Sequence, residues 1–227
     1  MLPKVIIHTE VSVDGRMDRL GDDGFLYYRL IADWPIDAML SGSRTMLAAY
    51  PNPDDGDEPP PPEKAPDLQR LVVVDSRGSI QSWRQMQQSP WWGEITLLCT
   101  AATPPAYVEQ VKALGIDVLV AGEDRVDFKA ALEALNARYG IRVVRTDTGG
   151  VLHGVLLRAG LVDEISIVLA PTLIGGTSPA SFFVAPDLSP QAAAPNAAPI
   201  GLKLLHVENV EGDFVWLRYA VCKGERA

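Results

Sequence analysis

The chain is poor in the residues that bind metal ions and form disulfides. Its 227 residues include only two cysteines and three histidines. Cys99 and Cys222 lie in apolar, strand-like segments, and no metal-ligand spacing relates them to the histidines. We expect two buried free thiols rather than a disulfide, which suits a reducing cytoplasm. The composition therefore predicts neither a metal centre nor a disulfide framework.

Positive charge and long apolar runs are also scarce. Lys and Arg number 20 against 29 Asp and Glu, and the net charge of −9 opposes binding to nucleic acid or to an anionic membrane surface. No apolar run reaches the ~18 residues that a membrane span needs. The N-terminus turns polar too soon for a signal peptide. We therefore expect a cytoplasmic protein with a small-molecule partner, in which any phosphate site is built locally from N–H groups and a few arginines.

Strand-like and helix-like segments alternate along the chain, and no repeat interrupts them. We expect strands over residues 5–11, 38–41, 70–75, 95–100, 117–121, 141–146, 164–169, 201–210 and 214–222. We expect helices over 25–31, 43–49, 105–114 and 127–139, with a further short helix that ends near Gly160. This order predicts one α/β domain over residues 1–227 with a largely parallel sheet. The last two strands meet at Glu211-Gly212-Asp213 and predict an antiparallel hairpin at one edge.

Two stretches have a biased composition. Pro51–Pro66 is rich in proline and acidic residues, and Pro186–Pro199 is rich in alanine and proline. The first predicts a stiff, solvated surface loop, with a recognition segment as the alternative. The second predicts an irregular excursion. Neither reads as a domain boundary, because the strand–helix order resumes after each.

A glycine pair lies between a strand and a helix near the middle of the chain. Gly149 and Gly150 follow the β-branched strand 141–144. Glycine lets a backbone come close to a ligand, and the helix start offers free N–H groups to an anion. A side chain at Gly149 is expected to intrude on that ligand and to demand a forbidden φ. The alternative is a tight turn without a ligand.

Several motifs around this turn resemble one known family. Residues 149–164 read Gly-Gly-Val-Leu-His-Gly-Val-Leu-Leu-Arg-Ala-Gly-Leu-Val-Asp-Glu, followed by Ala-Pro-Thr-Leu-Ile-Gly-Gly at 170–176. Segments 12–16, 42–45 and 73–78 match in the same order. Together they resemble the reductase domain of riboflavin biosynthesis. The resemblance implies a dihydrofolate-reductase-like fold, an α/β architecture of three layers whose mostly parallel central sheet carries helices on both faces and an antiparallel C-terminal hairpin.

The same resemblance implies NADPH as the cofactor. Its expected contacts are a helix start, a turn after a strand and the glycine pair, namely Ser43, Arg44, Thr45, Ser76, Arg77, Gly149, Gly150, Val151 and Leu152. A hydroxyl and a cation at a helix start suit a pyrophosphate. An arginine at the end of a parallel strand can bind a 2′-phosphate through its fork of N–H groups. The alternatives are an exposed helix residue for Arg44 and a plain β-turn closed by Gly78.

On the substrate side we expect Asp147 and Asp14 as catalytic residues, Asp147 from the resemblance and Asp14 from its position directly after the first strand. The family usually has Glu at position 147, where it touches the pyrimidine of the substrate, and Gly at position 148, where this chain has Thr148. Asp14 and Asp147 are expected to face one cleft, although Asp14 could serve only as a turn former before Gly15. His153 is interpreted as an exposed helix residue without an acid–base role.

The chain departs from the family where the substrate's 5′-phosphate is held. Two family arginines fall near Asp33 and Gly56, the second within the acidic proline-rich loop. The zinc signature of the fused deaminase is also missing. The expected reaction is NADPH-dependent reduction of 5-amino-6-(5-phosphoribosylamino)uracil or its 2,5-diamino pyrimidinone relative, with hydride transfer to C1′ of an opened imine. The alternatives are an unphosphorylated pterin-like or carbonyl substrate, and a non-catalytic nucleotide-binding dimer. The resemblance also implies a homodimer, for which the C-terminal hairpin offers apolar surface.

Overall fold

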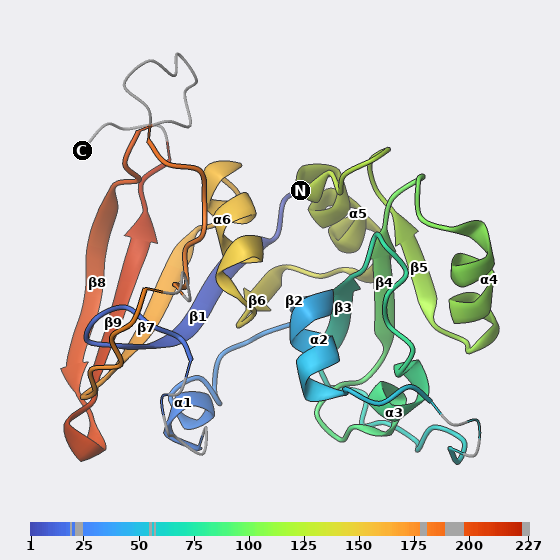
Figure 1. Cartoon of the computed structure of the whole chain (residues 1–227), viewed down its shortest axis with the longest axis horizontal. Coiled ribbons are helices and arrows are strands. Elements are labelled where there is room, and N and C mark those ends of the chain that lie inside the picture. The colour runs from blue at the N-terminus through green and yellow to red at the C-terminus, as the bar shows by residue number, and fades with distance from the viewer. Residues whose placement is uncertain are drawn as a thin grey trace. The chain divides into compact units, whose positions relative to one another are not determined.

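The computed structural model describes residues 1–18, 20, 25–54, 56, 58–177, 181–188 and 198–223. Its contacts divide the chain into two compact units (Figure 1). Unit 1 holds Met1–Pro3 and Ile36–Val144, and unit 2 holds Lys4–Pro35 and Arg145–Ala227. Within the described residues, no helix has the length and apolar character of a membrane span.

Unit 1 is a parallel α/β unit. Its strands follow the order β5 (Asp117–Val120), β4 (Ile95–Cys99), β3 (Arg70–Val74) and β2 (Ala38–Gly42), and each neighbouring pair is parallel. The connections contain α2 (Ser43–Ala49), α3 (Trp83–Gln88) and α4 (Pro105–Ala113). After β5 the chain forms α5 (Phe128–Tyr139) and enters β6 (Val143–Thr146), which begins in unit 1 and ends in unit 2.

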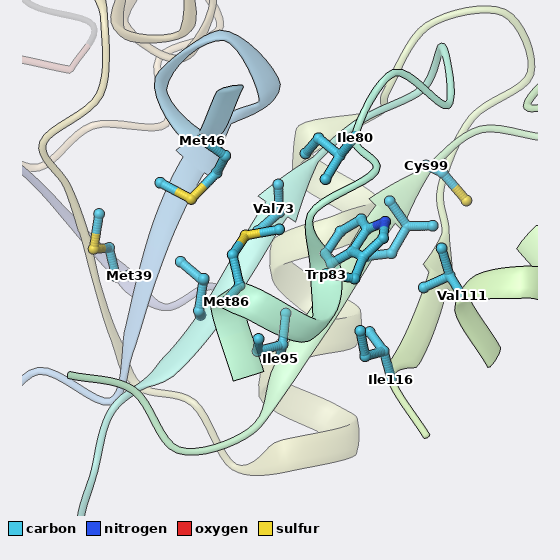
Figure 2. Close-up of a cluster of buried hydrophobic side chains, with 12 residues drawn as sticks. Met39, Met46, Val73, Ile80, Trp83, Met86, Ile95, Cys99, Val111 and Ile116 are labelled. Carbon is cyan, nitrogen blue, oxygen red and sulfur yellow. The ribbon is translucent and has the colours of Figure 1, made fainter. Parts of the chain in front are cut away.

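The core of unit 1 explains why its helices form where they do. Apolar side chains of β2, β3 and β4 pack with residues of α2, α3 and α4, among them Met39, Val73, Met46, Trp83 and Val111 (Figure 2). Because strand side chains alternate between faces, Thr96 belongs to the opposite face from Leu97. Arg70 bonds to Thr96 on that face and stacks on Tyr139 of α5. Helices therefore cover both faces of this sheet, as the sequence predicts.

Side-chain and glycine caps mark the ends of α5 and the start of α3 in unit 1. Asp127 accepts a hydrogen bond from the Ala130 N–H at the start of α5, and Gly140 ends that helix with φ 70°. The helix was predicted from the sequence over 127–139, and an aspartate at the N-cap and a glycine after the last turn are typical of its two ends. The six-residue α3 was not predicted, because one apolar pair three residues apart is too weak a periodic signal. The carboxylate of Asp54 accepts hydrogen bonds from the first N–H groups of α3, so the proline-rich loop holds this helix in place.

Unit 2 combines parallel and antiparallel strands. The order is β1 (Lys4–Ser12), β7 (Glu164–Ala170), β9 (Val215–Val221) and β8 (Leu202–Asn209). β1 and β7 are parallel, whereas β9 is antiparallel to both β7 and β8. The 3₁₀ turn η1 (Glu211–Asp213) joins β8 to β9, so the predicted hairpin is confirmed. The unit also carries α1 (Phe25–Arg29) and α6 (Gly150–Arg158). The α/β class and the antiparallel C-terminal strands are therefore as expected.

The two compositionally biased stretches have different outcomes. The described residues between Pro51 and Ala65 belong to no helix or strand, and most of their side chains are exposed, as expected of a solvated loop. In the second stretch, residues 189–197 lie outside the described residues, so the predicted excursion is only partly visible. Its described flanks, 186–188 and 198–199, contain no helix or strand.

Candidate functional site

The predicted cofactor residues of unit 1 gather at one edge of its sheet. Ser43 to Thr45 begin α2 directly after β2, and Ser76 and Arg77 follow β3. The two strands are parallel neighbours with Gly42 paired to Val74, so both segments leave the sheet side by side. Arg44 and Arg77 are exposed. This carboxyl edge, with two accessible cations, is the place where α/β proteins commonly bind ligands.

The glycine pair in unit 2 is not a pair of equivalent residues. A Cβ on Gly149 would meet no atom within 4 Å, whereas a Cβ on Gly150 would lie 2.0 Å from the carbonyl oxygen of Ser181. Gly154, one turn later, has the same constraint, with 1.9 Å to the carbonyl oxygen of Val184. Gly150 and Gly154 are therefore required because segment 181–184 packs directly on α6.

Gly149 has no such structural requirement. Its φ is −73° and its ψ is 158°, which any residue can adopt, so the expected forbidden φ at this position is wrong. It caps α6 without a side-chain hydrogen bond and leaves open space in front of the first turn. Val151 is exposed and Leu152 half-buried. The open space at Gly149 suits a ligand that approaches the backbone.

His153 is buried, contrary to its interpretation as an exposed helix residue. Its side chain has no exposed surface, and Nδ1 lies 3.0 Å from the carbonyl oxygen of Phe182. A carbonyl only accepts, so Nδ1 carries the proton. Burial lowers the pKa of His153 to about 4, which keeps the imidazole neutral. The error arose because segment 181–184, distant in sequence, covers this face of α6.

Asp147 forms a buried ion pair that the sequence reasoning missed. Its Oδ2 lies 3.4 Å from Nη2 of Arg145, and the two side chains are 4% and 8% exposed. The ring of Tyr28 lies 5.9 Å from the guanidinium carbon of Arg145. Burial raises the pKa of Asp147, while Arg145 acts in the opposite direction. The spacing of two residues between Arg145 near the end of β6 and Asp147 just after it was the available signal for this pair.

Asp14 joins two of the family-like segments. Its carboxylate accepts hydrogen bonds from the Ser12 hydroxyl at 2.7 Å, from the Ile174 N–H at 3.1 Å and from the Gly175 N–H at 2.7 Å. These hydrogen bonds, that of Ser12 first, lower the pKa of Asp14 to about 2. Asp14 thus anchors the loop after β7, which is more than a turn former does. Among the described residues, no hydrogen bond or ion pair joins Asp14 to Asp147, and their common cleft stays a prediction.

Other parts of the structure do not add to this site. A cavity of about 600 Å³ in unit 1 opens near the amino ends of the strands, where Asp37, Arg70 and Glu94 line it. None of the predicted cofactor residues lines that cavity. Both cysteines are free, Cys99 buried and Cys222 half-buried. The described residues contain no group of three or more potential metal ligands.

Known proteins resemble this chain over nearly its whole length. A reductase of 2,5-diamino-6-ribosylamino-4(3H)-pyrimidinone 5′-phosphate from Methanothermobacter thermautotrophicus is 36% identical over 190 residues, which cover 78% of this chain and 81% of that protein. Among solved structures, RibD from Acinetobacter baumannii matches with a TM-score of 0.70 and 22% identity over 97% of this chain. The match spans 58% of that RibD chain.

A dihydrofolate reductase from Enterococcus faecalis shares the fold at a TM-score of 0.50 with 13% identity, over 96% of each chain. The family model of the RibD C-terminal domain matches residues 3–216 and so includes every segment on which the resemblance was based. With this match and the 36% identical relative, the chain belongs to the RibD C-terminal domain family.

Proposed function

We propose that this protein is an NADPH-dependent reductase of riboflavin biosynthesis. Its expected substrate is 2,5-diamino-6-ribosylamino-4(3H)-pyrimidinone 5′-phosphate or 5-amino-6-(5-phosphoribosylamino)uracil. The observation that carries the proposal is the 36% identical relative, named as a reductase of the first compound and matched over 81% of its length. We further propose a cytoplasmic homodimer. The two free cysteines support a cytoplasmic location, and the exposed apolar residues of β8 support a homodimer.

The cofactor residues fit NADPH in two respects. Arg44 and Arg77 are exposed cations at the carboxyl edge of unit 1, where they can bind phosphate oxygens, and Ser76 lies beside Arg77. In unit 2, Gly149 leaves open space before the N–H groups of α6. We assign Ser43, Arg44 and Thr45 to phosphate oxygens of the cofactor and Ser76 and Arg77 to its 2′-phosphate. We assign Gly149 to Leu152 to its pyrophosphate. Bound NADPH supplies the hydride.

The substrate residues Asp147 and Asp14 act by positioning the substrate for hydride transfer. The ribosylamine opens to an imine, C1′ receives the hydride, and the imine nitrogen receives a proton. We assign Asp147 to the pyrimidine ring, because burial and Arg145 hold its carboxyl in one place. Asp14 acts by fixing the loop at Ile174 and Gly175. Positioning of this kind is the main contribution a protein makes to hydride transfer.

An assay of NADPH oxidation with four compounds tests the proposal. The two pyrimidine nucleotides and their dephosphorylated forms are each incubated with the protein, and the product is identified by mass spectrometry as the ribitylamino compound. We expect turnover of a phosphorylated compound. Turnover of only the dephosphorylated forms would favour the alternative substrate, which Asp33 and Gly56 at the family's arginine positions also favour. Cofactor binding without any turnover would leave a nucleotide-binding protein.

A further inference from the structure

The buried carboxylate of Asp75 forms hydrogen bonds within the turn that carries Ser76 and Arg77. Asp75 is 1% exposed. Its Oδ2 accepts hydrogen bonds from the N–H groups of Ser79 at 2.7 Å and Ile80 at 2.9 Å. Its Oδ1 accepts from the Ser79 hydroxyl at 2.9 Å. One side chain thus closes the turn, whose outer residues are Ser76 and Arg77.

Tyr107 of α4 supports the same turn. Its hydroxyl donates to Oδ2 of Asp75 at 2.8 Å and accepts from Nε1 of Trp83 at 3.1 Å. Burial and the charge of Asp75 raise the pKa of Tyr107, so the hydroxyl remains a donor. The ring also lies against Gly78, where φ is +67° and a Cβ would be 2.9 Å from Cγ of Tyr107. The ring therefore limits the turn to a glycine at this position.

Thr103 makes the third contact, directly to Ser76. Its hydroxyl donates to the Ser76 carbonyl oxygen at 2.9 Å and accepts from the Thr100 N–H at 3.1 Å. Thr103 is 2% exposed. The loop after β4 is thereby bonded to the turn after β3. Position 76 is fixed through its backbone, while Arg77 remains exposed to solvent.

We propose that Asp75, Tyr107 and Thr103 are positioning residues that preorganise the Ser76–Arg77 turn for the 2′-phosphate of NADPH and so set the preference for NADPH over NADH. The proposal rests on the proposed function, since Ser76 and Arg77 are its cofactor residues. A fixed turn binds a phosphate without first losing conformational freedom. A displaced turn would weaken NADPH binding more than NADH binding, because only NADPH carries the 2′-phosphate.

The test is calorimetric affinity for both cofactors in the full-length protein. D75A removes all four hydrogen bonds, and we expect NADPH affinity to fall at least about tenfold, with a much smaller change for NADH. D75N should retain most of the affinity, because its amide oxygen can replace Oδ2 while its NH₂ donates to the Ser79 hydroxyl. T103V keeps the shape of the side chain and removes its hydrogen bonds to the Ser76 carbonyl oxygen and the Thr100 N–H, and we expect about a two- to tenfold loss of affinity for NADPH.

Two controls separate this proposal from its alternatives. L135A lowers stability through a buried residue of α5 in the same unit and should leave the ratio of the two affinities unchanged. R77A tests the proposed function itself. If R77A lowers the NADPH preference and neither D75A nor T103V does, the positioning role is wrong. If R77A has no effect, the cofactor assignment is wrong whatever the others do. Should D75A not fold, T103V alone decides.

Discussion

Oγ of Ser166 lies 2.9 Å from Nδ1 of His8, and this contact belongs to a hydrogen-bond network around a completely buried imidazole. The other ring nitrogen, Nε2, lies 3.0 Å from the carbonyl oxygen of Tyr27 and must donate to it. Nδ1 therefore accepts the Ser166 hydroxyl, which in turn accepts from Nε1 of Trp216 at 2.9 Å. The network joins β1, β7, β9 and α1 through an imidazole that burial keeps neutral.

Acid should weaken the fold through its two buried histidines. Burial lowers the pKa of His8 to about 3 and that of His153 to about 4. In the unfolded chain both protonate near the ordinary pKa of about 6.5. The unfolded state therefore binds more protons below that pH, and the free energy of unfolding falls by about 1.4 kcal/mol per pH unit for each histidine. Between about pH 6.5 and about pH 4, both contribute.

Urea denaturation at a series of pH values measures the slope of the free energy of unfolding against pH. H153Q removes one of the two groups and should make the slope shallower by about half. H206Q removes the histidine of β8, which is not fully buried, and serves as the matched control. Asp147, whose pKa burial raises, acts in the opposite direction in all three proteins and drops out of the comparison. Equal slopes in wild type and H153Q would contradict the expectation.

Gly149 and Gly150 should respond differently to substitution. G149V places its side chain in open space, so stability should change little while NADPH binding is lost, because the side chain occupies the space assigned to the pyrophosphate. G150A brings a Cβ to 2.0 Å from the Ser181 carbonyl and should lower stability by about 1–3 kcal/mol. Thermal melts with and without saturating NADPH distinguish the two. A G149V protein that keeps its full ligand-induced shift would show that this turn binds no pyrophosphate.

Arg77 should discriminate between the two nicotinamide cofactors. Loss of a charge-assisted contact to the 2′-phosphate costs about 1.5–3 kcal/mol, or roughly ten- to a hundredfold in affinity for NADPH. R125A, which removes another exposed arginine of unit 1, provides the comparison for a simple loss of charge. Calorimetry with wild type should show tighter binding of NADPH than NADH. An unchanged NADPH affinity in R77A would be evidence against this assignment.

Breaking the pair of Arg145 and Asp147 from one side should destabilise unit 2. R145M leaves a carboxylate that is 4% exposed without its cation, a change that typically costs about 3–5 kcal/mol. The double variant R145M/D147L removes both charges and should recover much of this loss. Chemical denaturation of the wild type, R145M, D147L and R145M/D147L gives the coupling free energy between the two side chains. Additive effects would mean that the two side chains do not interact.

The β8 edge should mediate a homodimer. Leu202, Leu204, Leu205 and Val207 are 43%, 51%, 52% and 58% exposed on the outermost strand of unit 2. Exposed apolar edge strands tend to pair with another chain. Light scattering at micromolar concentration should give twice the chain mass of 24.6 kDa, and L204D/V207D should shift the mass towards the monomer. A wild-type mass of 24.6 kDa would contradict this prediction.

The helices and strands could be predicted from the sequence, because each depends on a local pattern of residues. Among the described residues, all nine strands and five of the six α-helices lie within a few residues of their expected ranges, because each has its own periodicity, cap or glycine stop. Contacts between distant segments were beyond reach. The packing of segment 181–184 on α6 reversed the interpretation of His153 and separated the roles of Gly149 and Gly150. Arg145 escaped notice because a cation within an apolar strand reads as an exposed residue until its buried partner is known.

The division into units has a consequence for how the chain is completed during synthesis. Apart from Met1–Pro3, unit 1 is one uninterrupted stretch, Ile36–Val144, inserted into unit 2. Its two ends meet: the Asp37 N–H donates to the Val143 carbonyl at 3.1 Å, and the Asp37 carboxylate accepts from the N–H groups of Arg142 and Val143. The pairs β2–β3, β3–β4 and β4–β5 are all made within that stretch. In unit 2, by contrast, β1 cannot pair with β7 until more than a hundred further residues have been synthesised, because Ile6 pairs with Glu164. Early folding of the insert holds Asp37 beside Val143 and so shortens the effective loop that β1 and β7 must close once β7 has been synthesised.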